Sequence, residues 1–203
     1  QVDFLEANKD YSMCFHAADV KVESDSLSNR TNGTNYSTIE DREYESTEFV
    51  SHWIVPTASM VYRVGLIENF PMKHPERLVF GDIVKVLKCA HMGKVRGMSD
   101  MMSVYRIQPN SVTNNPNSVN HIVMRLPDHY LCLRKNFPKV DKGPLEWSIS
   151  FYHYQRMKRQ SDLFLKICDF CKFVWWNPSN ARRKIRSVAR KRFHFELNRS
   201  ENK

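Results

Sequence analysis

The hydrophobic pattern in the first half of the chain predicts one helix followed by two strands. Between Thr57 and Phe70 the apolar side chains recur at roughly helical spacing, and Pro71 would end such a helix. Residues 77–86 (RLVFGDIVKV) form a short β-branched run, and residues 93–98 follow a turn. Both stretches are typical of strands.

The second half of the chain predicts a loop, a helix and two further strands. Residues 109–120 are dense in Asn, Ser and Pro and indicate a loop, followed by a helix over 121–126. Apolar residues alternate with others from Leu145 to Phe151, and again between Leu163 and Trp176. This order predicts an α/β (α+β) fold with a mixed sheet and flanking helices.

Composition favours a soluble globular protein. Of the 203 residues, 41% are hydrophobic, which is enough for a core of moderate size. No stretch approaches the roughly 18 apolar residues of a membrane span, and the first residues lack the pattern of a secretory signal. We therefore expect a cytoplasmic protein. The five cysteines, an odd number at scattered spacing, argue against a disulfide scaffold.

Charge divides the chain into three parts. Residues 1–50 carry 11 acids and 4 bases, residues 51–181 carry 9 acids and 18 bases, and residues 182–203 carry 2 acids and 9 bases. The polar stretch Ser24–Thr38 has almost no apolar side chains to bury. These features predict a flexible acidic segment over 1–38, a folded domain over 39–181 and a basic helix or tail over 182–203.

The basic tail begins with a dense group of bases that could contact nucleic acid. Its members are Arg182, Arg183, Lys184, Arg186, Arg190, Lys191 and Arg192. Seven bases within eleven residues, with no acid among them, repel one another unless a polyanion screens them. A solvated helix face and, less favoured, a membrane surface are the alternatives.

An acidic cluster precedes the first predicted helix. Asp41, Glu43, Glu45 and Glu48 place four carboxylates within eight residues. Crowded carboxylates are costly unless a divalent cation binds among them, as in metal-dependent nucleases. The alternative is a solvated acidic surface.

Two short pairs of His and Cys have the chemistry of a zinc site. His129 and Cys132 form one pair, and Cys168 and Cys171 form a CxxC pair. Together they would supply four ligands for tetrahedral Zn²⁺. Buried cysteines with a histidine in a purely structural role are the alternative, equally compatible with the spacing.

Several of these segments resemble, in order, landmarks of the Schlafen nuclease domain. They are Leu-Pro-Asp-His-Tyr-Leu-Cys (126–132), Val-Asp-Lys-Gly-Pro-Leu (140–145) and Asp-Phe-Cys-Lys-Phe-Val-Trp-Trp-Asn-Pro (169–178). Upstream, Glu43 and Glu48-Phe49 resemble the Glu…Glu-Phe-Lys signature of that family, with Val50 in place of the Lys. The strand expected to end at Gly81-Asp82 resembles the one that supplies the third carboxylate.

The resemblance implies a Schlafen-like lobe with a metal-dependent endoribonuclease site. Glu43, Glu48 and Asp82 would hold Mg²⁺ or Mn²⁺, and His129, Cys132, Cys168 and Cys171 would hold a structural Zn²⁺. Full-length Schlafen nucleases close two such lobes around RNA, so a single lobe implies other Schlafen-like subunits in a hetero-oligomer. The nematode nuclease that trims the 5′ ends of piRNA precursors is such an assembly. The competing functional class is a non-catalytic module that binds nucleic acid or protein.

Overall fold

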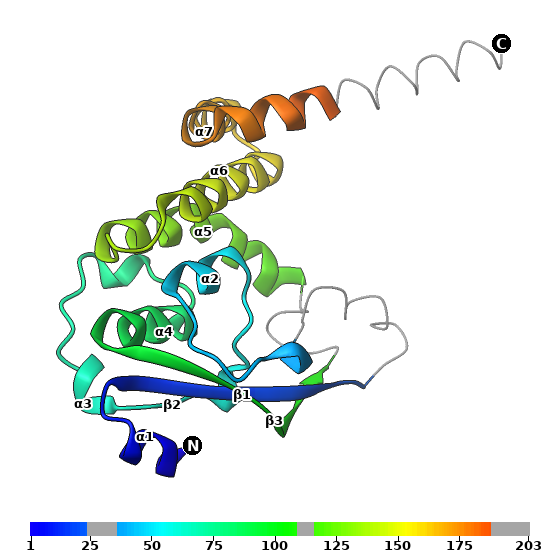
Figure 1. Ribbon diagram of the computed structural model, residues 1–203. Helices are drawn as coiled ribbons and strands as arrows, with labels where there is room; N and C mark the ends of the chain where they lie inside the picture. The colour runs from blue at the N-terminus through cyan, green and yellow to red at the C-terminus, as the bar shows by residue number, and fades with distance from the viewer. Residues whose placement is uncertain (24–35, 109–115, 188–203) are drawn as a thin grey trace. The chain divides into compact units, whose positions relative to one another are not determined.

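The computed structural model describes residues 1–23, 36–108 and 116–187 (Figure 1). The chain divides into two compact units, Gln1–Leu145 and Glu146–Lys203. The fold class predicted from the sequence, a mixed α+β fold, is confirmed. The five cysteines are free. No helix within the described ranges is long and apolar enough to cross a membrane.

The sheet of the first unit has three strands in the order β2-β1-β3. The central strand β1 (Tyr11–Val22) pairs antiparallel with β2 (Val61–Tyr62) and parallel with β3 (Lys94–Ile107). Seven consecutive residues of β1, numbers 12–18, are buried. The expectation that residues 1–38 form a flexible segment is therefore wrong for this strand, because the acidic flanks hid its apolar centre.

Short elements connect the strands of the first unit. Around β1 the structure has α1 (Val2–Ala7), η2 (Tyr36–Thr38) and α2 (Ser46–Ser51). The single helix expected over 57–70 is instead divided into η3 (Thr57–Ser59), β2 and α3 (Val64–Ile67). Pairing of Val61 with Cys14 and of Tyr62 with Met13 provides the reason, because it draws these residues into the sheet. After Pro71 comes η4 (Pro75–Arg77).

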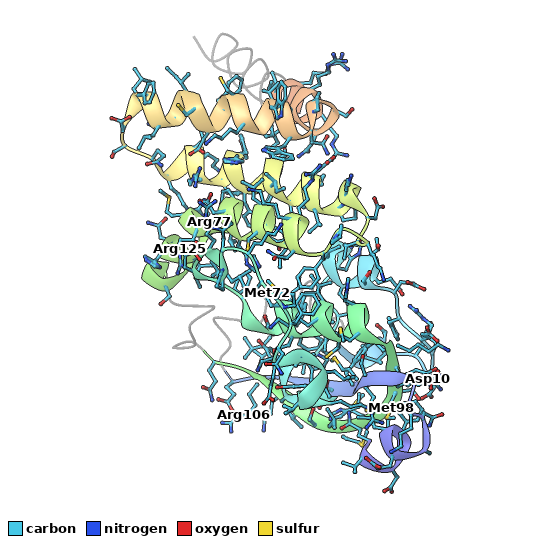
Figure 2. All side chains as sticks on the ribbon, turned by 90° about the vertical axis from the view of Figure 1, so that its left-hand side faces the viewer. Asp10, Met72, Arg77, Met98, Arg106 and Arg125 are labelled. Carbon is cyan, nitrogen blue, oxygen red and sulfur yellow. The ribbon has the colours of Figure 1, made fainter. Side chains whose placement is uncertain are left out.

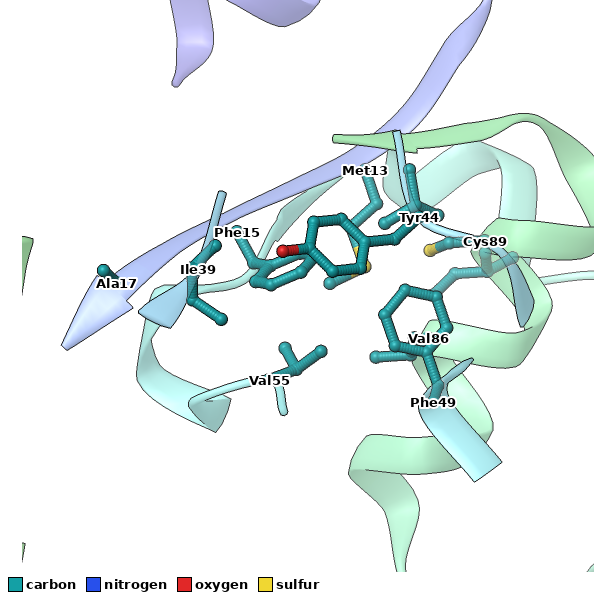
Figure 3. Close-up of a cluster of buried hydrophobic side chains, with 11 residues drawn as sticks. Met13, Phe15, Ala17, Ile39, Tyr44, Phe49, Val55, Val86 and Cys89 are labelled. Carbon is teal, nitrogen blue, oxygen red and sulfur yellow. The ribbon is translucent and has the colours of Figure 1, made fainter. Parts of the chain in front are cut away.

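One core cluster lies between the sheet and its helices (Figure 3). Met13 and Phe15 of β1 pack with Phe49 of α2 and Val86 of α4 (Gly81–Met92). The ring of Phe15 contacts Tyr44 edge-to-face at 5.2 Å between centroids. These contacts fix the segment 40–50, which carries the predicted acidic cluster, against the sheet.

A second core cluster includes α4, a helix that occupies most of the strand expected over 77–86. Helix α4 buries Ile83, Val84 and Leu87 in this cluster, together with Leu133 of α5 (Pro116–Asn136). It also buries Val86 in the first cluster. The expected strand stopped at Val86 and so left out Lys88 and His91. Together with Asp82 and Lys85 these polar residues recur every third position, which is the spacing of one helix face.

The strand expected over 93–98 is confirmed as part of β3, and it includes a glycine with no room for a side chain. A Cβ atom at Gly97 would lie against the Tyr44 ring and 2.8 Å from the carbonyl oxygen of Glu40. Gly97→Ala should therefore lower the free energy of unfolding by about 1–3 kcal/mol. The matched control is Gly65→Ala, where nothing lies within 4 Å. Urea unfolding measures both, and equal stabilities of the two variants would contradict the expected close approach.

The second unit is helical among the residues that are described. Helix α6 (Lys142–Arg159) starts in the first unit and continues in the second, which also contains α7 (Leu163–Trp176) and helical residues 178–187. The strands expected at Leu145–Phe151 and Leu163–Trp176 are wrong. The helix expected over 121–126 is confirmed within α5, and the basic helix is confirmed as far as residue 187. Helix α5 begins at Pro116, so the loop expected over 109–120 is wrong for its last five residues.

Candidate nucleic-acid interface

The three carboxylates expected to bind a catalytic metal are engaged in separate contacts. The backbone of Glu43 forms an isolated antiparallel β-bridge with that of Arg96, and the Glu43 carboxylate lies 3.5 Å from Lys94 Nζ. Glu48 of α2 accepts hydrogen bonds from both Nη atoms of Arg42, at 3.0 and 2.6 Å. Asp82, in the first turn of α4, accepts one from Thr57 Oγ1 at 3.2 Å.

Arg42 is the residue that the sequence reasoning missed at this site. Hydrogen bonds from its guanidinium hold the pKa of Glu48 below its usual range, although burial opposes this shift. Glu48 also accepts a hydrogen bond from the backbone N–H of Glu45, completing a capping box at the start of α2. The carboxylate therefore has an internal cationic partner and a structural role, and this arrangement does not fit a shared divalent cation.

The expected zinc ligands are divided between the two units. His129 and Cys132 lie one turn apart in α5 of the first unit, whereas Cys168 and Cys171 lie in α7 of the second. The Cys132 thiol points at the carbonyl oxygens of Lys73 and His74, at 3.2 and 3.4 Å. Burial raises the pKa of Cys132, which favours the neutral thiol over the thiolate that binds zinc.

No group of three or more His, Cys, Asp or Glu side chains suited to a metal ion occurs in residues 1–23, 36–108 and 116–187. The zinc site and the catalytic metal site thus stay predictions from the sequence. Metal analysis of the purified protein tests the first directly.

Two pockets of the first unit have mixed charge. One, of about 620 Å³, surrounds Arg42, whose guanidinium is paired with Glu40 and Glu48. The other, of about 290 Å³, is lined by Arg77 and Arg125 together with Glu76 and Asp128. Arg77 and Arg125 are labelled in Figure 2. Acidic side chains offset the bases in both, so neither is suited to a polyanion.

The second unit has a pocket that combines aromatic rings with bases. It has a volume of about 330 Å³, and its lining residues come from α6, α7 and the helical stretch 178–187. They are Trp147, Phe151, Tyr154, Phe173, Asn180, Arg183, Lys184 and Ser187. No acidic side chain is among them. We call this site the aromatic-basic pocket.

The rings of the aromatic-basic pocket are arranged as a platform on α6. Trp147 and Phe151 are stacked, with centroids 5.1 Å apart and planes 7° from parallel. The Trp147 side chain remains 41% exposed. Lys184 Nζ lies 5.4 Å from the ring centre of Tyr154, and Lys158 Nζ lies 5.5 Å from the same centre. Cations and aromatic rings therefore occur together at one site.

The charge of the surroundings matches this pocket. Residues 146–187 include nine basic and three acidic residues. One of the three acidic residues, Asp169, is buried and paired with Arg156. Two of the predicted nucleic-acid-binding residues, Arg183 and Lys184, line the pocket. Arg182 and Arg186 are exposed on the same helical stretch. The other three, Arg190, Lys191 and Arg192, lie outside the described residues.

The sequence contains a signal for the aromatic platform that the strand prediction concealed. Trp147, Phe151 and Tyr154 are spaced four and three residues apart, which is the spacing of one helix face. The strand prediction assumed a period of two, which places Trp147 and Phe151 on the same face as Leu145 and Ile149.

Comparisons with known proteins do not assign this chain to a family. No protein-family model, no curated protein and no solved structure matches the chain. The Schlafen resemblance therefore rests on the sequence segments alone.

Proposed function

We propose that the chain is an RNA-binding subunit that holds a single-stranded segment at the aromatic-basic pocket. The observation that carries this proposal is the stacked Trp147–Phe151 pair, with Trp147 exposed, in a pocket that Arg183 and Lys184 also line. Unpaired nucleobases stack on aromatic side chains, and the cationic side chains of Arg and Lys contact the phosphates of the same strand. A double helix keeps its bases stacked on one another, so a platform of this kind favours single strands.

The proposed assembly follows the Schlafen resemblance. In it, the chain contributes RNA binding to a hetero-oligomeric endoribonuclease that processes small-RNA precursors or structured RNA. Hydrolysis by Glu43, Glu48 and Asp82 has no support in the observed contacts, because Arg42 and Lys94 already neutralise two of the three carboxylates. Binding without chemistry of its own is the function that the geometry supports better.

Substitution at the platform tests the proposal. Trp147→Ala should weaken binding of a fluorescein-labelled single-stranded oligoribonucleotide about five- to a hundredfold, because stacking contributes about 1–3 kcal/mol per base. Fluorescence anisotropy measures the affinity. The control is Trp175→Ala, which removes a tryptophan that is 80% exposed and does not line the pocket.

The salt dependence of binding supplies a second readout. Lys184→Gln should reduce the slope of log K against log salt by about 0.7, the contribution of one phosphate contact on a single strand. Unchanged affinity in Trp147→Ala together with an unchanged slope in Lys184→Gln would refute the proposed interface. The same oligoribonucleotide with Mg²⁺ or Mn²⁺ added reports any hydrolysis.

A further inference from the structure

Helix α7 has an apolar surface on its outer side in addition to the one it buries. Asp169 and Phe173 lie on the buried side. Another set of large side chains is exposed, among them Phe164 at 71% and Trp175 at 80%. The set consists of Leu163, Phe164, Ile167, Phe170, Cys171 and Trp175. We call it the outer α7 face.

The outer α7 face forms a continuous stripe along the helix. At about 100° per residue, its six members fall within a sector of about 140°. The stripe runs from residue 163 to residue 175 and so extends for about 18 Å. A row of exposed aromatic and aliphatic side chains of this length is typical of an interaction site, whereas single exposed apolar residues need no explanation.

Charges next to the stripe indicate what kind of partner it accepts. Lys166 and Lys172 lie beyond its opposite edges at helical spacing. The acidic residues at this helix already have partners. Asp162, which precedes α7, accepts a hydrogen bond from the Leu165 N–H as the N-cap, and Asp169 of α7 is paired with Arg156. An apolar stripe with one lysine beyond each edge is complementary to an apolar stripe with acidic residues along its edges.

The same charges argue against two other occupants. Residues 146–187 of a second copy would also carry nine basic and three acidic residues. Contact between two such basic surfaces is unfavourable because like charges repel. A helix that lies in a membrane surface presents a charged face opposite its apolar face. The side of α7 opposite the stripe instead carries Asp169 and Phe173, which are buried in the protein.

We propose that the outer α7 face docks an amphipathic helix of another protein chain, one with acidic residues along both edges of its apolar stripe. Helix-in-groove recognition of this kind uses apolar anchors at positions i, i+3, i+4 and i+7. Phe164, Ile167 and Cys171 have this spacing on α7 itself. The site is separate from the aromatic-basic pocket, which none of the six members of the face lines.

A displayed library of randomised helical peptides, selected on the full chain, tests this proposal. We expect the enriched peptides to share an apolar stripe flanked by Glu or Asp. Their binding should weaken at least tenfold for Ile167→Glu, and Lys172→Glu should weaken it severalfold. Trp147→Ala, at the other site, should leave it unchanged. Circular dichroism checks that the surface variants keep their helical content.

Four results would overturn the proposal. The first is enrichment of basic peptides or of none, and the second is equal peptide binding by Ile167→Glu and the original chain. A dimer in light scattering that Ile167→Glu dissociates would assign the face to a second copy. Co-sedimentation with phosphatidylcholine–phosphatidylserine vesicles that Ile167→Glu abolishes would assign it to a membrane.

Discussion

Replacing Asp169 with alanine should lower the free energy of unfolding of the second unit by about 3–5 kcal/mol. The Asp169 side chain is 3% exposed and lies 2.9 Å from His153 Nδ1 and 2.7 Å from Arg156 Nη2. Without its carboxylate, the largely buried Arg156 loses the charge that neutralises it. Urea unfolding, together with hydrogen exchange of α6 and α7 amides, measures the loss.

Two further variants separate the charge effect from a packing effect. Asp169→Asn keeps the shape of the side chain but removes its charge, so it should lose a large part of the same free energy. The double variant Arg156→Met/Asp169→Leu removes both charges and should recover most of the stability, because apolar replacements of buried ion pairs are often neutral. A single Asp169→Ala variant as stable as the original chain would contradict the proposed role of this network.

Acidification from pH 7 to pH 4 should reduce the stability of the first unit by about 3 kcal/mol through His129 alone. Burial, assisted by the charge of Arg125, lowers the pKa of His129 from 6.5 to about 4. The unfolded chain therefore takes up a proton below about pH 6.5 that the folded chain does not accept. The stabilising contribution is complete above that pH and is lost as the pH falls toward 4.

The surroundings of His129 explain why it resists protonation. Its Nδ1 accepts a hydrogen bond from the Val79 N–H at 3.3 Å, so its proton is on Nε2. Within the described part of the chain Nε2 is buried without a hydrogen-bond partner. The ring also contacts Phe80 edge-to-face. A charged imidazole would have to be desolvated in this apolar setting.

Comparison with His129→Leu isolates this contribution. The variant loses the acceptor for Val79 N–H at every pH, so its stability is lower by a constant amount. Its free energy of unfolding should fall by about 3 kcal/mol less between pH 7 and pH 4 than that of the original chain. Parallel pH profiles of the two proteins in urea unfolding would show that His129 does not cause the acid sensitivity.

Local sequence signals correctly predicted three elements. The strand at 93–98, the helix at 121–126 and the basic helix after Pro178 were predicted correctly. Each has a signal that depends only on neighbouring residues: a turn before the strand, helical spacing, or a helix start followed by bases. Two of the residues that line the aromatic-basic pocket, Arg183 and Lys184, came from this reasoning.

Elements that are apolar on two sides were predicted wrongly. Helix α7 combines a buried side with the outer α7 face. In α6, the buried Leu145 and Ile149 alternate with the pocket residues Trp147 and Phe151. In α6 and α7 apolar residues therefore lie on both sides of the helix, and the period of 3.6 that distinguishes a helix from a strand is lost.

The sequence by itself determined the mixed fold class and the basic character of the C-terminal half, because these depend on composition and short-range spacing. Only the tertiary structure decided which charged groups meet. It paired Glu48 with Arg42 and Asp169 with Arg156, and it placed Trp147 and Phe151 beside Lys184. Such contacts depend on how helices and strands pack, and spacing along the chain carries no information about the partner that packing brings to a side chain.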